Sequence, residues 1–130
     1  MDDCQRTPVL KPVHFVADTR EGIRVFPDEV RRASGHALQF AQRGEKSPNA
    51  RPLKGYRGAG VLEIVEDYGT DTYRVVYTVR FEGIVYVLHA FQKKSPSGRR
   101  TAGKDLALIR ERLKRAEEHY RREFLPARRG

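Results

Sequence analysis

The sequence predicts a protein of the α/β class, of the α+β type, in which helices pack on a small and mostly antiparallel sheet. Three runs rich in β-branched and aromatic residues follow one another with short turns between them. A helical pattern of apolar residues precedes these runs, and a longer one follows them. The 130 residues suit one domain with a single core.

The first elements are expected between residues 11 and 42. A weak alternation over residues 11–18 indicates a first strand. Pro27 follows, with Asp28 and Glu29 placed to favour the start of a helix, so we expect an N-terminal helix or helical hairpin. The apolar positions with helical spacing are Val30, Ala33, Ala37, Phe40 and Ala41.

The sheet is expected to be formed mainly by the central part of the chain. Residues 44–60 are basic and rich in glycine and proline, which predicts a loop or a short helical remnant. Residues 61–67, 72–80 and 84–93 are then predicted as three strands. Their tight connections imply an antiparallel meander.

A long C-terminal helix is predicted after residue 101, with Thr101 or a neighbour as its cap. Its outer face mixes cations and carboxylates, which fits a solvated surface with local ion pairs or a dedicated binding face. We expect one domain over residues 11–124, with flexible ends at 1–10 and 125–130. The apolar face carries Leu106, Ile109, Leu113, Ala116 and Tyr120.

The composition favours a polyanionic partner such as nucleic acid. The chain has 26 Lys and Arg against 17 Asp and Glu, a net charge of +9. The single cysteine, Cys4, excludes an intramolecular disulfide or a cysteine metal cluster. Acidic residues at positions 2 and 3 argue against a signal peptide, and the longest apolar run is too short to span a bilayer. We therefore expect a cytoplasmic protein without a membrane partner.

Cations within and after the predicted strands suggest a site that faces phosphate. Arg74 lies inside a central strand, where an unpaired charge is costly, so it needs a partner or a task. The alternative to phosphate binding is an ion pair with Glu63 or Glu66 of the neighbouring strand. Lys93 and Lys94 end the next strand, where they could instead serve as a polar edge.

Alternation places His89 on the same side of its strand as Phe91 and Lys93. An imidazole with its ordinary pKa near 6.5 could act there as acid or base. The alternative is a hydrogen-bonded core histidine. Phe91 could stack on a base or belong to the core. Lys54 and Arg57 lie in the glycine-rich loop before the sheet, which could follow an RNA strand or be an ordinary solvated loop.

Three stretches, in order, resemble the phage-related HigB-type toxins of the RelE/ParE superfamily. They are Pro52-Leu-Lys-Gly, Tyr73-Arg-Val-Val-Tyr77 and Leu88-His-Ala-Phe-Gln-Lys-Lys-Ser95. The resemblance covers roughly Phe15 to Leu113. The chain departs from the family in having Thr101-Ala102 where Thr-Pro is common, and in a longer C-terminal helix.

The resemblance implies a RelE-like fold and an endoribonuclease that cuts mRNA, often mRNA engaged by the ribosome. It implies no metal or other cofactor, and a cognate helix-turn-helix antitoxin that holds the toxin inactive. A ribose 2′-hydroxyl would attack the neighbouring phosphodiester, with cations and an imidazole moving protons and neutralising charge. Arg74, which aligns with the family's strand arginine, Lys93 and His89 become candidate catalytic residues. The candidate RNA-binding residues are Lys94, Lys54, Arg57 and Phe91.

Other classes of protein share parts of this pattern. A non-enzymatic ParE-like toxin would bind DNA gyrase, but Arg74, His89 and the lysine pair argue against it. A basic nucleic-acid-binding module without catalysis would explain the charge, but not an arginine in a central strand. A phage structural or regulatory protein could carry the same fold.

Overall fold

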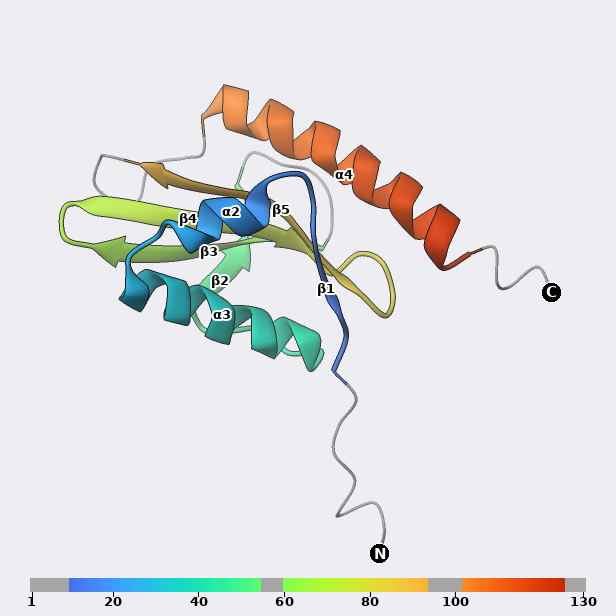
Figure 1. Ribbon diagram of the computed structural model, residues 1–130, viewed down its shortest axis with the longest axis horizontal. Coiled ribbons are helices and arrows are strands. Elements are labelled where there is room, and N and C mark those ends of the chain that lie inside the picture. The colour runs from blue at the N-terminus through green and yellow to red at the C-terminus, as the bar shows by residue number, and fades with distance from the viewer. Residues whose placement is uncertain (1–9, 55–59, 94–101, 126–130) are drawn as a thin grey trace, which may run out of the picture.

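The computed structural model of the protein describes residues 10–54, 60–93 and 102–125. Most of the two predicted flexible ends lies outside these residues, as do Thr101, Arg57 and Lys94. Figure 1 shows the elements in space. In chain order they are β1 (Val13–Phe15), α2 (Thr19–Arg24), α3 (Asp28–Gln42), β2 (Ala50–Pro52), β3 (Val61–Tyr68), β4 (Asp71–Thr78), β5 (Val85–Lys93) and α4 (Gly103–Glu123).

The five strands form one sheet in the order β1-β5-β4-β3-β2. The strands β3, β4 and β5 make the predicted antiparallel meander, and β2 pairs antiparallel with β3. Only one of the pairings in the described sheet, β1 with β5, is parallel. The predicted mixed fold with a mostly antiparallel sheet is therefore confirmed.

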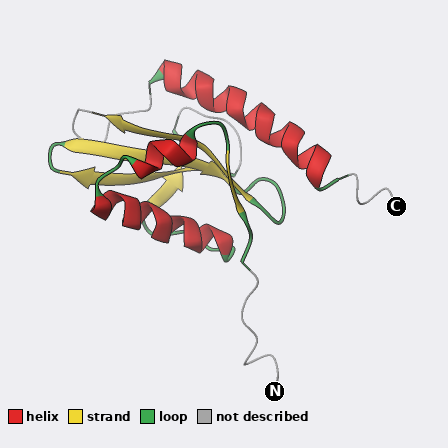
Figure 2. Cartoon of the chain, in the orientation of Figure 1, coloured by secondary structure: helices red, strands yellow, loops and turns green. Residues whose placement is uncertain are grey.

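Helices cover both faces of this sheet, as Figures 1 and 2 show. The short helix α2 and the helix α3 lie on one face, where one apolar cluster includes Val30, Leu38 and Val75. The helix α4 lies on the other face, where a second cluster includes Val76, Leu88 and Ile109. We call this second side the α4 face. Strand β4 is buried along almost its whole length because both faces are covered.

Two elements differ from the prediction. The segment 44–60 was expected to contain no strand, yet Ala50–Pro52 pairs with β3 at the edge of the sheet. Pro52 is tolerated because an edge strand has a free side on which no N–H is needed. The helix α2 was given no residue range by the sequence, which left a single N-terminal helix or a helical hairpin open; Gly22 in its middle weakens its sequence signal.

A β-bulge in β5 decides which side chains reach the α4 face. Val76 is opposite His89 and Tyr77 is opposite Val87, so Leu88 is an additional residue on its strand. Before the bulge, Val85 and Val87 belong to the α3 side. Without it, simple alternation would have put His89 on that side too.

The helix α4 follows the predicted C-terminal pattern, with Ile109, Leu113 and Ala116 buried against the sheet. Its N-cap residue, Ala102, makes no side-chain capping hydrogen bond. In the described part of the chain, no helix has the length and apolar character needed to cross a membrane.

Candidate functional site

Four of the predicted site residues meet on the α4 face of β4 and β5. Arg74 is opposite Phe91, and Lys93 is opposite Thr72 at the end of the ladder. His89 is on the same side because its ring stacks on Phe91, with 4.5 Å between ring centroids and 22° between ring planes. We call these four residues, Arg74, His89, Phe91 and Lys93, the β4–β5 cluster.

The helix α4 runs antiparallel to β5 across this face. Asp105 in its first turns contacts His89, Arg112 binds the Leu88 carbonyl, and His119 near its end contacts Tyr86. Because the helix begins at Gly103, the last residues of β5 extend beyond its first turn. Of the described elements, α4 thus leaves the Lys93 end of the cluster uncovered, and we call this end the open end.

Arg74 is the most deeply buried member of the cluster, with only 1% of its side chain exposed. Its Nη1 donates to Glu63 Oε1 at 3.2 Å, and Glu63 is equally buried. On the other carboxylate oxygen, Glu63 accepts from Arg51 Nε at 2.9 Å, and Arg51 is 40% exposed. This is the ion pair expected under the alternative interpretation. Glu63 of β3 is thus paired with an arginine from each of the two neighbouring strands, β2 and β4.

His89 is also mostly buried, with 12% of its side chain exposed. Its Nε2 lies 2.9 Å from Asp105 Oδ1, and its buried Nδ1 has no hydrogen-bond partner among the described residues. Burial lowers the pKa of His89 below 6.5, and the hydrogen bond and charge of Asp105 only partly oppose this. The expectation of an ordinary pKa was wrong because the sequence does not show that α4 covers this ring.

The remaining predicted residues occupy different places. Phe91 is half-buried and also packs against the apolar cluster under α4. Lys93 is partly exposed at the end of β5. Lys54 is exposed just after β2, at the far edge of the sheet from β5. Lys94 and Arg57 lie outside the described residues, so their predicted roles stay predictions.

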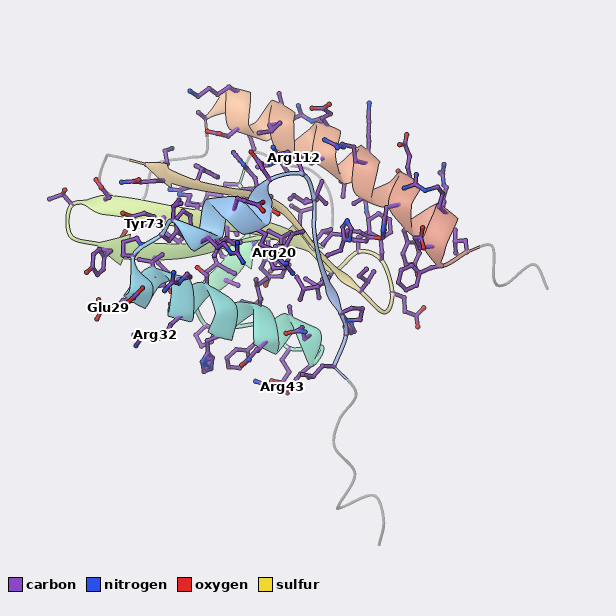
Figure 3. The ribbon with its side chains drawn as sticks, in the orientation of Figure 1. Arg20, Glu29, Arg32, Arg43, Tyr73 and Arg112 are labelled. Carbon is purple, nitrogen blue, oxygen red and sulfur yellow. The ribbon has the colours of Figure 1, made fainter. Side chains whose placement is uncertain are left out.

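Sequence reasoning missed three residues around the cluster. Asp105 holds His89, Arg51 shares Glu63 with Arg74, and Arg112 links α4 to the Leu88 carbonyl and to Asp18 Oδ1, at 3.1 and 3.0 Å (Figure 3). The charge pattern predicts Arg112 on the solvated face of the C-terminal helix, and this was wrong: Arg112 lies one turn after Ile109 and its side chain is buried against β5. Nothing in the sequence pairs Asp105 with His89.

A pair of histidines, His14 and His119, joins the far half of α4 to the sheet. The rings of His14 and His119 stack with centroids 4.1 Å apart, and His119 Nδ1 lies 2.7 Å from the hydroxyl of Tyr86. Burial, and then the nearby His119, lower the pKa of His14. Burial raises the pKa of Tyr86 to about 12, so its hydroxyl stays neutral.

The lowered pKa values predict that acid destabilises the fold. His14 and His89 bind protons more weakly when folded than when unfolded, where the pKa is about 6.5. Proton binding by these two histidines therefore favours the unfolded chain. This destabilising effect is absent well above pH 6.5 and grows as the pH falls below it. We expect a lower free energy of unfolding at pH 5.5 than at pH 7.5 in urea titrations.

The variant His14→Phe keeps a ring against His119 but cannot take up a proton, so it should show a smaller difference between the two pH values. His36→Gln, at an exposed position on α3, is the matched control. If the free energy of unfolding of His14→Phe depends on pH as strongly as that of the wild-type chain, the lowered pKa of His14 does not contribute to the acid sensitivity.

In the ranges 10–54, 60–93 and 102–125, no group of three or more His, Cys, Asp or Glu side chains is arranged to hold a metal ion. What the cluster offers chemically is a set of positive charges beside an imidazole and an aromatic ring. A guanidinium and an ammonium bind phosphate oxygens, and an imidazole transfers protons near neutral pH.

Comparison with protein families gives one match, which spans residues 21–114 and thus more than half of the chain. It is the family described as phage derived protein Gp49-like. The chain belongs to this family. The matched region of this Gp49-like chain runs from α2 into α4 and contains the whole β4–β5 cluster.

Solved structures similar to the Gp49-like chain include a mutant of the E. coli toxin RelE in the free state. Its identity is 16% and its TM-score 0.49, with 82% of this chain and 97% of that chain covered. Another is the toxin–antitoxin complex RelBE2 from Mycobacterium tuberculosis, at 23% identity and a TM-score of 0.40, with 68% and 98% covered. Among curated proteins, none matches the chain.

Proposed function

We propose that this Gp49-like chain is the toxin of a type II toxin–antitoxin module and acts in the cytoplasm as a metal-independent endoribonuclease on mRNA, either free or engaged by the ribosome. A cognate helix-turn-helix antitoxin would hold it inactive. The match to a phage-derived family agrees with the phage-related HigB-type resemblance of the three sequence motifs. The net charge of +9 favours an RNA substrate.

The observation that carries the proposal is the β4–β5 cluster itself. Two cations and an imidazole lie on one face of two paired strands, beside an aromatic ring, and Lys93 among them lies at the end that α4 does not cover. Rigid strands hold such groups more precisely than loops do. The paired Arg51 and Glu63 next to the cluster allow Arg74 to exchange partners without leaving a lone buried carboxylate.

The reaction suited to these groups is internal transesterification. The 2′-hydroxyl oxygen of one ribose attacks the adjacent phosphorus, its proton leaves to a base, and the bond from phosphorus to the 5′-oxygen breaks. That oxygen takes up a proton, so the products are a 2′,3′-cyclic phosphate and a 5′-hydroxyl. Lys93 would contact the phosphate, and Arg74 would neutralise charge that develops on it.

His89 is suited to take up the 2′-hydroxyl proton. If the Asp105 carboxylate accepts from Nε2–H, as the 2.9 Å separation suggests, Nδ1 carries the lone pair. This nitrogen has no hydrogen-bond partner in the described residues, and because it is buried a ribose reaches it only after the start of α4 moves away from His89. The lowered pKa keeps the ring neutral at pH 7, which is the form that acts as a base. Asp105 would then be a positioning residue.

Induced expression of the chain alone in bacteria tests this function. We expect growth arrest together with new internal 5′ ends in mRNA, detected by primer extension on total RNA. Growth arrest with intact transcripts and inhibited gyrase supercoiling would instead support the ParE-like alternative. Normal growth at full expression would contradict both toxin proposals.

Replacing Lys93 tests the open end of the cluster. Lys93→Ala should reduce RNA cleavage by about tenfold or more, because a hydrogen bond to a charged group contributes roughly 1.5–3 kcal/mol. Lys94→Ala should matter less, since the alternation expected from the sequence puts Lys94 on the opposite side from Lys93. Lys104→Ala, an exposed lysine at the start of α4, is the matched control. Equal losses in all three variants would indicate a general effect of charge rather than a site.

A further inference from the structure

A hollow on the opposite side of the molecule from the β4–β5 cluster is not used by the proposed reaction. It has a volume of about 520 Å³ and lies between α3 and the segment that leads into β2. We call it the α3 groove. It is lined by Arg32, Ala33, His36 and Phe40 of α3 and by Pro48 and Asn49 of the following segment.

The far wall of the groove is held in place by local hydrogen bonds. The Asn49 side chain donates to Glu66 of β3, and the Asn49 backbone N–H donates to Ser47 Oγ at 3.2 Å. Lys46 Nζ donates to the Ala50 carbonyl oxygen at 3.0 Å. This segment is therefore tied to the sheet, and the groove is formed before any ligand arrives.

The floor of the groove is apolar and its rim is cationic. Ala33, Ala37, Phe40 and Pro48 supply carbon surface, while Arg32 lies at one end with no carboxylate in ion-pair distance among the described residues. Arg43 does not line the groove but lies next to it, over the ring of the lining residue Phe40 at 5.2 Å, and it reaches Glu45 only at 3.8 Å. Figure 3 shows Arg32 and Arg43 on the side of α3 that points away from the sheet.

The arrangement around Phe40 favours a peptide over RNA as the occupant. His36, one turn before Phe40, stacks on its ring with 5.4 Å between centroids, and Arg43 approaches it from the turn after. The ring is thus flanked from both directions along the helix, which leaves little open aromatic face for a base. An apolar side chain can still use the floor, and carboxylates can reach the two arginines.

We propose that the α3 groove binds an acidic segment of a partner protein, with an apolar side chain on the floor and carboxylates on Arg32 and Arg43. Arg43 directly follows the last residue of α3, 11 positions after Arg32, so their backbones are separated by roughly 16 Å. The segment therefore needs carboxylates about five residues apart if it is extended. Within the proposed function, on which this assignment rests, the partner is the antitoxin.

Docking at the α3 groove has a consequence for regulation. The groove is on the α3 side of the sheet and the β4–β5 cluster on the α4 face, so this segment anchors the partner without covering the cluster. Another part of the partner must then reach the cluster or change α4. Anchoring and inhibition are separable in this arrangement.

A binding experiment on the full chain tests the groove without relying on RNA cleavage. The probe is a fluorescent 12-residue peptide with leucine at its centre and glutamates five residues apart, and its glutamine version is the uncharged control. A 12-nucleotide uridylate is the competing class of ligand. The protein variants are the double charge reversal R32E/R43E and, as matched control, Arg115→Glu on the exposed face of α4.

We expect the acidic peptide to bind the wild-type chain and Arg115→Glu similarly, and R32E/R43E at least about tenfold more weakly, because like charges then meet across the groove. The glutamine peptide should bind more weakly than the acidic one to the wild-type chain. No peptide binding, or equal binding by all three proteins, would overturn the proposal. Oligonucleotide binding that falls in R32E/R43E while peptide binding does not would assign the groove to RNA.

Discussion

Replacing Arg74 with alanine is expected to lower RNA cleavage by about 100-fold or more, the effect of losing one preorganised donor to a developing negative charge, about 2.7–4 kcal/mol. The same variant should also be less stable, because Arg74 is buried and paired with Glu63. Both effects follow from one side chain that has a structural partner and a proposed ligand.

Two measurements separate these effects. Cleavage is measured well below the melting temperature of each variant, with the folded fraction determined by circular dichroism. Arg74→Lys keeps the charge but loses the planar fork, so it should recover part of the stability and less of the activity. If cleavage per folded molecule is unchanged in Arg74→Ala, the residue is a structural ion-pair member and takes no part in the reaction.

Removing the carboxylate is expected to have the largest effect on stability. Glu63→Ala should cost about 3–5 kcal/mol of the free energy of unfolding, the usual result of breaking a buried ion pair from one side. Glu63 is 1% exposed and carries an arginine on each carboxylate oxygen. Urea titration of the variant and of the wild-type chain measures the loss.

Glu66→Ala is the matched control on the same strand. Glu66 is opposite Tyr73, whereas Glu63 is opposite Val76, so the two carboxylates point to different faces. Glu66 accepts from the Asn49 side chain near the surface, so its loss should cost no more than about 1 kcal/mol. Similar losses in both variants would contradict a special role for the buried pair.

The central sheet could be predicted from sequence because its signal is local. The bounds of β3, β4 and β5 agree with the predicted strands to within two residues, since β-branched and aromatic runs with tight turns specify such strands. The helix α3 likewise follows the predicted start after Pro27. By contrast, β2 has three residues, too few to show a period, and is a strand only because β3 lies beside it.

The surroundings of the candidate site depend on contacts that no local pattern contains. Arg74 is opposite Val65 and lies diagonal to Glu63. This register places Glu63 on the same face as Arg74 and Glu66 on the other face, so Glu63 is the partner. The bulge at Leu88 sets the face of His89. Asp105 reaches His89 because α4 packs antiparallel to β5, which is a tertiary relation. The sequence therefore identified the reactive residue types, but not their burial or their partners.

The chemistry of the cut ends tests the central claim most directly. Total RNA is taken after induction of the wild-type chain and of Arg74→Ala, and the internal 5′ ends of mRNA are mapped with and without prior phosphorylation by a kinase. Attack by the 2′-hydroxyl predicts ends that become ligatable only after phosphorylation, abundant with the wild-type chain and about 100-fold rarer with the variant. Growth arrest with no new ends, or with ends that already carry a 5′-phosphate, would contradict the proposed reaction.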